Sequence, residues 1–112
     1  GATSAINVGK PGANVARIRF GDQRDVMLLV ADSEVMRGGY QINLYGTKGW
    51  RSITPELTNL YSYLLEAFLD LVINGKESVP IEEEVELIAS LEAAKRSLTL
   101  GREVPLSEVL NG

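Results

Sequence analysis

The stretch from Pro80 to Pro105 most constrains the fold, because it reads as one long helix with a defined start and stop. Pro80 or Ile81 is expected to begin it, and Glu82, Glu83 and Glu84 suit the positive end of a helix dipole. Gly101 predicts a left-handed cap, followed by an extended exit. Its apolar residues recur at helical spacing, with a predicted central stripe of Leu87, Leu91, Ala94 and Leu98, flanked by Ile81, Val85 and Ile88.

A second helix is predicted upstream, with Thr54 as N-cap, Pro55 at the first helical position and Gly75 as the stop. Its apolar stripe is broad enough to predict a buried core helix; the stripe consists of Leu57, Leu60, Tyr61, Leu64, Leu65, Phe68, Leu71 and Val72. In the later helix, Ala89, Ala93 and Ala94 are small enough to let another element approach closely.

Residues before these helices alternate between apolar and polar side chains, which is typical of strands. Glycine-containing turns separate them, and the predicted strands are 4–8, 14–20, 25–32, 40–45 and 50–53. The third is apolar on both faces and should be covered on both sides. The fold class that follows is α+β, with a mostly antiparallel sheet of four or five strands. Both long helices are expected on one sheet face, leaving the other face open.

Composition excludes several classes of function. The chain has 112 residues, enough for one domain, and a formal charge of -4 without a basic cluster, which argues against nucleic-acid binding. It contains neither Cys nor His, which removes thiolate and imidazole chemistry along with disulfides. Its longest apolar run, 26–31, is far shorter than the roughly 20 residues of a membrane span. We expect a cytoplasmic protein without membrane contact, and the missing initiator Met suggests an excised piece of a longer chain.

No complete catalytic, cofactor or metal site is predicted. Glu82, Glu83, Glu84 and Glu86 form the only dense carboxylate cluster, but consecutive helical residues point about 100° apart and do not converge. The glycine turns 9–12 and 46–49 are predicted to be reverse turns, because neither joins a strand to a helix as a phosphate loop would. No GxGxxG follows a strand, so the chain encodes no dinucleotide site.

The open sheet face is instead the predicted functional surface. If Ala16, Ile18 and Phe20 face the helices together with Tyr40, Ile42 and Leu44, their neighbours lie on the other face. Those neighbours are the candidate interface residues Val15, Arg17, Arg19, Gln41, Asn43 and Tyr45. A mixture of aliphatic, Tyr and Arg side chains suits a two-fold protein interface better than bulk water.

Three stretches resemble the later part of the C-terminal domain of the Gfo/Idh/MocA family of NAD(P)-dependent oxidoreductases. They are INLYGTKGW (42–50), LLEAFLDLVINGKESVP (64–80) and ELIASLEAAKRSLTLGREVPL (86–106). Together they cover more than half the chain. In that family an N-terminal Rossmann domain binds the cofactor, and the catalytic Lys, Asp and His come from upstream segments. No residue here carries those roles, since the chain has no E-K-P motif and no His.

The resemblance implies a scaffold that oligomerises through its sheet face and forms part of a substrate pocket, inactive without the Rossmann domain of its parent. NAD(P) would then belong to the parent and not to this chain. The alternative is a stand-alone, non-catalytic module that binds a protein or a small ligand on the open face. A small enzyme using only Arg and carboxylates is a third possibility.

Overall fold

The computed structural model describes residues 1–34 and 39–112. It divides the chain into two compact units, residues 1–36 with 79–112, and residues 37–78. Whether they form the single domain expected from the sequence stays a prediction.

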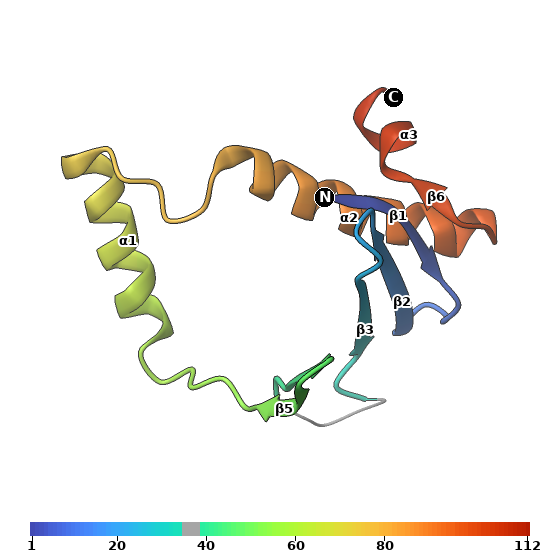
Figure 1. The fold of residues 1–112 in the computed structure, drawn as a ribbon, viewed down its shortest axis with the longest axis horizontal. Coiled ribbons are helices and arrows are strands. Elements are labelled where there is room, and N and C mark those ends of the chain that lie inside the picture. The colour runs from blue at the N-terminus through green and yellow to red at the C-terminus, as the bar shows by residue number, and fades with distance from the viewer. Residues whose placement is uncertain (35–38) are drawn as a thin grey trace. The chain divides into compact units, whose positions relative to one another are not determined.

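The first unit contains a four-stranded antiparallel sheet (Figure 1). Its strands are β1 (Ala2–Asn7), β2 (Ala13–Phe20), β3 (Asp25–Ala31) and the short β6 (Val104–Pro105). The sheet order is β3-β2-β1-β6. Consecutive strands β1, β2 and β3 pair as a meander, and β6 pairs with the edge of β1 that β2 does not occupy. The predicted strand boundaries agree with β1, β2 and β3 to within two residues.

Helix α2 (Ile81–Leu100) packs on one face of this sheet with its smallest side chains. Its buried residues are Ala89, Ser90, Ala93, Ala94 and Ser97. They lie against a core that includes Ala5, Ala16 and Ile18. Small side chains on both surfaces bring the helix close enough for the Asn7 backbone N–H to donate to Ser97 Oγ at 2.9 Å. This close approach confirms the predicted use of the alanines.

The predicted buried face of α2 is wrong, because most of the predicted central stripe is not buried. Leu91 is 49% exposed and Leu87 59% exposed, and only Ala94 of that stripe is buried. The helix surface nearest the strands has no room for leucine side chains, so these point away from the sheet. At the ends the predictions are confirmed: α2 begins at Ile81 after Pro80, and Gly101 caps it in the left-handed region with φ 66°.

The C-terminal segment returns to the same core. After β6, helix α3 (Leu106–Leu110) buries Leu106, and Val109 packs against the core cluster. Arg102 donates to both carboxylate oxygens of Glu108, at 3.1 and 2.8 Å. The predicted extended exit is therefore present, and the tail that follows it docks on the core.

The second unit consists of the hairpin β4 (Ile42–Gly46) and β5 (Gly49–Ile53) and of helix α1 (Leu60–Asn74). Gly49, at φ 136°, makes the tight turn that the sequence predicts. Gly75, at φ 65°, ends α1 as expected. The helix starts at Leu60, however, so Thr54 and Pro55 were wrongly assigned to its first turn. Glu56 instead accepts hydrogen bonds from the backbone and hydroxyl of Thr58, which closes a local turn before the helix.

The predicted burial of α1 is also wrong: none of its side chains is buried. Its stripe residues are 45–78% exposed from Leu60 onward. A hairpin and one helix provide too little apolar surface to form a core of their own. The α+β class itself is confirmed, with a four-stranded antiparallel sheet, a separate hairpin and two long helices.

Candidate interaction surface

The face of the sheet opposite α2 is the best-defined candidate surface. Residues paired directly across antiparallel strands share a face. Ala5, Ala16 and Ile18 face α2, so the alternate residues of β1, β2 and β3 lie on the helix-free side. Val15, Arg17 and Arg19 are among them, as predicted.

Side chains on this face fall into three rows across the strands. The first row is Val8, Val15 and Leu29, the second is Ile6, Arg17 and Met27, and the third is Ser4, Arg19 and Asp25. Polarity therefore rises steadily from one end of the face to the other. We call its five aliphatic and Met residues the apolar patch: Ile6, Val8, Val15, Met27 and Leu29.

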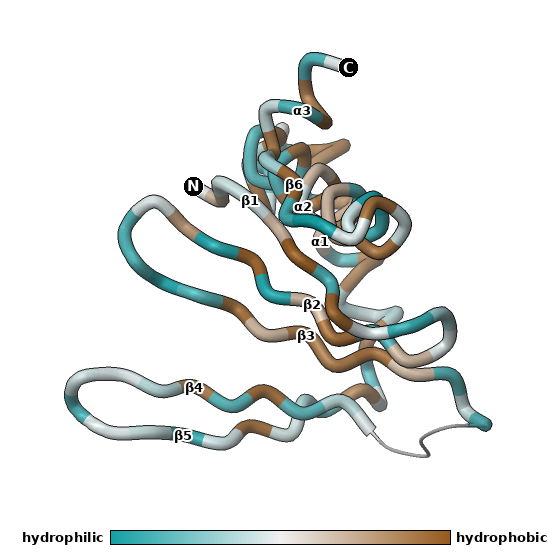
Figure 2. Tube along the Cα trace, turned by 90° about the vertical axis from the view of Figure 1, so that its right-hand side faces the viewer, coloured by the Kyte–Doolittle hydropathy of each residue, from teal (hydrophilic) through white to brown (hydrophobic). Residues whose placement is uncertain are grey.

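The apolar patch is open to solvent. Val8 is 72% exposed, Leu29 70% and Met27 61%, whereas Ile6 and Val15 are half-buried. Figure 2 shows the hydropathy of β3 as a largely brown, hydrophobic run along the strand. An exposed apolar cluster rimmed by charge is typical of a protein–protein contact surface.

The charged end of the face is internally paired. Arg17 Nη2 lies 2.5 Å from Asp25 Oδ2, and Arg19 Nε lies 3.6 Å from Glu103 Oε1. The hydrogen bond from Arg17 lowers the pKa of Asp25, and the nearby charges of Arg17 and Arg19 lower it further. Both ion pairs are solvent-exposed, so each contributes little to stability.

The other three predicted interface residues belong to the second unit. Asn43 and Tyr45 lie on β4, and Gln41 precedes it. Gln41 donates to Ser52 Oγ at 2.9 Å, and Ser52 is the direct partner of Asn43. The structure thus brings Val15, Arg17 and Arg19 together on one sheet and places the other three on a separate hairpin.

The hairpin has an exposed aromatic pair that was not predicted from the sequence. Tyr45 pairs directly with Trp50, and these side chains are 82% and 75% exposed. Tyr45 was assigned to the interface and Trp50 was interpreted as a core or interface anchor, but their direct pairing was not predicted. The signal was in the sequence: a two-residue turn places the residues flanking its glycines opposite each other.

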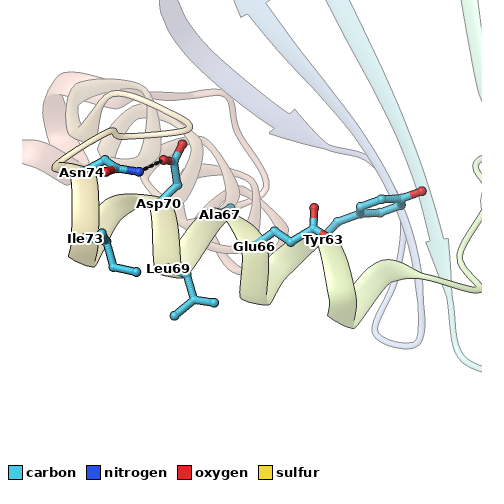
Figure 3. A pocket seen from close by; sticks show the side chains of 7 residues that line it. All are labelled: Tyr63, Glu66, Ala67, Leu69, Asp70, Ile73 and Asn74. Atoms are coloured by element: carbon cyan, nitrogen blue, oxygen red, sulfur yellow. Dashed lines mark hydrogen bonds between the residues drawn. The ribbon is translucent and has the colours of Figure 1, made fainter.

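A shallow pocket runs along α1, and all its lining residues come from that one helix (Figure 3). Tyr63 and Glu66 lie toward one end, and Asp70 and Asn74 toward the other. Asn74 donates to Asp70 at 2.7 Å, which is the main reason that the pKa of Asp70 is lowered. Nothing in this groove resembles a nucleophile with its base.

Within residues 1–34 and 39–112, no cluster of three potential metal ligands is present. Glu82, Glu83 and Glu84 form the first turn of α2 and are exposed, as expected of solvated helix-start charge. Glu86 has a structural contact instead, since its carboxylate accepts the Ala2 backbone N–H at 2.8 Å. None of the helices that the structure describes is long and apolar enough to cross a bilayer.

Comparison with known proteins found no matching family model, no matching curated protein and no matching solved structure.

Proposed function

We propose that this chain is a non-catalytic assembly domain that buries its apolar patch against a second copy of itself. The observation that carries the proposal is the exposure of Val8, Met27 and Leu29 beside the paired charges of Arg17 and Asp25. Removing apolar surface from water favours association by about 25 cal/mol per Å² before the costs of ordering. A single face with apolar and charged ends suits an isologous contact, in which the same patch serves both partners.

The resemblance to the C-terminal domain of Gfo/Idh/MocA oxidoreductases supports the same role. It implies a scaffold whose sheet face serves oligomerisation and whose parent protein holds NAD(P) on a separate Rossmann domain. The exposed stripe of α1 fits a chain that has further polypeptide to cover it. We propose accordingly that the chemistry of the parent resides outside these residues, and that this chain shapes part of a substrate pocket.

Light scattering at high micromolar concentration tests the assembly role. The wild-type chain should associate, and Val8→Glu should raise its dissociation constant at least about tenfold, because it puts a charge into the apolar row. Leu100→Glu is the matched control, since Leu100 is 51% exposed at the far end of α2. A monomeric wild type, or equal effects of the two variants, would refute the proposed contact.

Cofactor titration tests the proposal that the isolated chain is non-catalytic and binds no NAD(P). We expect no saturable binding of NAD(P)H by fluorescence and no turnover of sugars or polyols by the isolated chain. Measurable cofactor-dependent turnover would show that the chain holds chemistry of its own.

A further inference from the structure

Asn74, the last residue of α1, is followed by Gly75, and this pair has a covalent chemistry of its own. The backbone nitrogen after an asparagine can attack the side-chain Cγ, and glycine favours the attack because no Cβ crowds that nitrogen. Nothing lies within 4 Å of the position that a Cβ on Gly75 would take. The chain repeats the pair at Asn111 and Gly112, whereas its other asparagines precede Val or Leu: Asn7, Asn14, Asn43 and Asn59.

Hydrogen bonds restrain both reacting groups at the end of α1. The Asn74 side chain donates to Asp70 Oδ1, one turn back along the helix, at 2.7 Å (Figure 3). The Gly75 N–H donates to the Leu71 carbonyl at 2.9 Å, and the Lys76 N–H donates to the Asp70 carbonyl at 3.3 Å. For the reaction to occur, the carboxamide must turn from Asp70 toward Gly75. The Gly75 nitrogen must also lose the proton that Leu71 accepts.

These restraints are local to the last turn of the helix. Helix ends fray even where the middle of a helix is packed. No side chain of α1 is buried to anchor this end, and the Asp70 carboxylate is further held only by Lys76 Nζ at 3.5 Å. An exposed ion pair of this kind adds little stability. The hydrogen bonds that restrain Asn74 therefore break far more often than the fold as a whole.

We propose that Asn74 is a site of spontaneous deamidation, restrained by its hydrogen bond to Asp70. The deprotonated Gly75 nitrogen attacks Asn74 Cγ, the Cγ–Nδ2 bond breaks, and the amide nitrogen leaves as ammonia. The product is a cyclic succinimide, which water opens at either carbonyl to leave aspartate or isoaspartate at position 74. The net reaction consumes one water and releases one ammonia, without oxidation or reduction.

The product weakens the end of α1 irreversibly. A carboxylate at position 74 cannot donate to Asp70, and it places two like charges one helical turn apart. Negative charge at the C-terminal end of a helix also opposes the helix dipole. Isoaspartate in addition lengthens the backbone before Gly75, which displaces the N–H that caps the helix. The site uses no residue of the apolar patch, so it stands independently of the assembly role proposed above.

Timed incubation of the full chain at mildly alkaline pH, followed by peptide mapping with mass spectrometry, tests the site. Aspartate and isoaspartate should accumulate at Asn74. Asn59, at the other end of the same helix, is the internal control and should keep its amide because Leu60 follows it. The chain unfolded in guanidinium chloride at the same pH should convert about threefold to tenfold faster, because the restraining bonds are gone.

Three outcomes of this incubation would overturn the proposal. Equal conversion at Asn74 and Asn59 would mean that the reaction is not directed by Gly75. A native rate equal to the unfolded rate would mean that the hydrogen bond to Asp70 restrains nothing. A native rate more than about a thousandfold below the unfolded rate would mean that Asn74 reacts only when the whole fold opens.

Asp70→Ala tests the restraint directly. Loss of the acceptor should raise the conversion rate at Asn74 about threefold to tenfold. Glu66→Ala is the matched control, because it removes a carboxylate from the same helix and leaves the bond between Asn74 and Asp70 in place. Circular dichroism establishes that both variants are folded before incubation. Equal rates in the two variants would overturn the proposal, as would acid formation at position 74 that persists unchanged in Asn74→Gln.

Discussion

Helices α2 and α1 differ in a way that their sequences do not suggest. α1 has the stronger apolar stripe, with large aliphatic and aromatic residues on successive turns, yet it buries no side chain. α2 buries five residues, all of them Ala or Ser. Burial in these two helices therefore follows the closeness of backbone approach and not the size of the apolar residues. The large side chains of α1 and of the open sheet face are exposed.

The largest expected effect separates two neighbouring positions on α2. Ala93 is fully buried, so Ala93→Asp should cost about 3–5 kcal/mol by placing an uncompensated charge in the core. Leu91 is half exposed, and Leu91→Asp should cost under about 1 kcal/mol. Urea denaturation of both variants measures the difference. Equal destabilisation would mean that α2 presents a different face to the sheet.

A smaller effect distinguishes two buried serines. Ser97 Oγ accepts the Asn7 N–H, so Ser97→Ala should cost about 1–3 kcal/mol by leaving a buried donor unpaired. Ser90 donates to the carbonyl of Glu86 in its own helix, at 2.8 Å. Ser90→Ala loses no contact between α2 and the sheet and should be nearly neutral. Thermal unfolding of the pair checks the assignment, which fails if Ser90→Ala proves the more damaging change.

The smallest expected effect is the pH dependence of the surface ion pairs. Hydrogen bonds from Arg17 and Arg102 hold the pKa values of Asp25 and Glu108 below their ordinary values. Carboxyl groups with lowered folded pKa values stabilise the fold above their unfolded values of about 3.9 and 4.3. That stability is lost as the pH falls through the lower, folded values. Glu108→Gln should reduce this acid dependence of unfolding, and an unchanged profile would show that the pair contributes nothing measurable.

Much of the fold could be predicted from sequence because its signals are local. Alternation located β2, an apolar run between polar turns located β3, and glycines in positive φ located the ends of both long helices. The start of α1 was missed because Glu56 binds Thr58 in a turn that competes with the helix. The buried face of α2 was missed because the apolar stripe was traced through its leucines, which are the larger apolar residues. The helix instead approaches the sheet so closely that only Ala and Ser side chains fit between them.

The candidate surface was predicted only in part for a related reason. Strand alternation correctly placed Val15, Arg17 and Arg19 on the helix-free face. The third strand, predicted to be apolar on both faces, likewise puts Met27 and Leu29 on this face, whereas the contribution of Val8 depends on its cross-strand register with Val15. Register is set by pairing between segments, which no single strand sequence encodes.

Native-state hydrogen exchange of the dilute, monomeric chain measures the packing of α2 and of α1 separately. Amides of Ala89 to Ser97 in α2 should be the most protected in the protein, because they open only with the core. Amides of α1 should exchange close to unfolded rates, because a helix of this length without packing is only marginally stable in water. Equal protection of the two helices in the monomer would contradict the account.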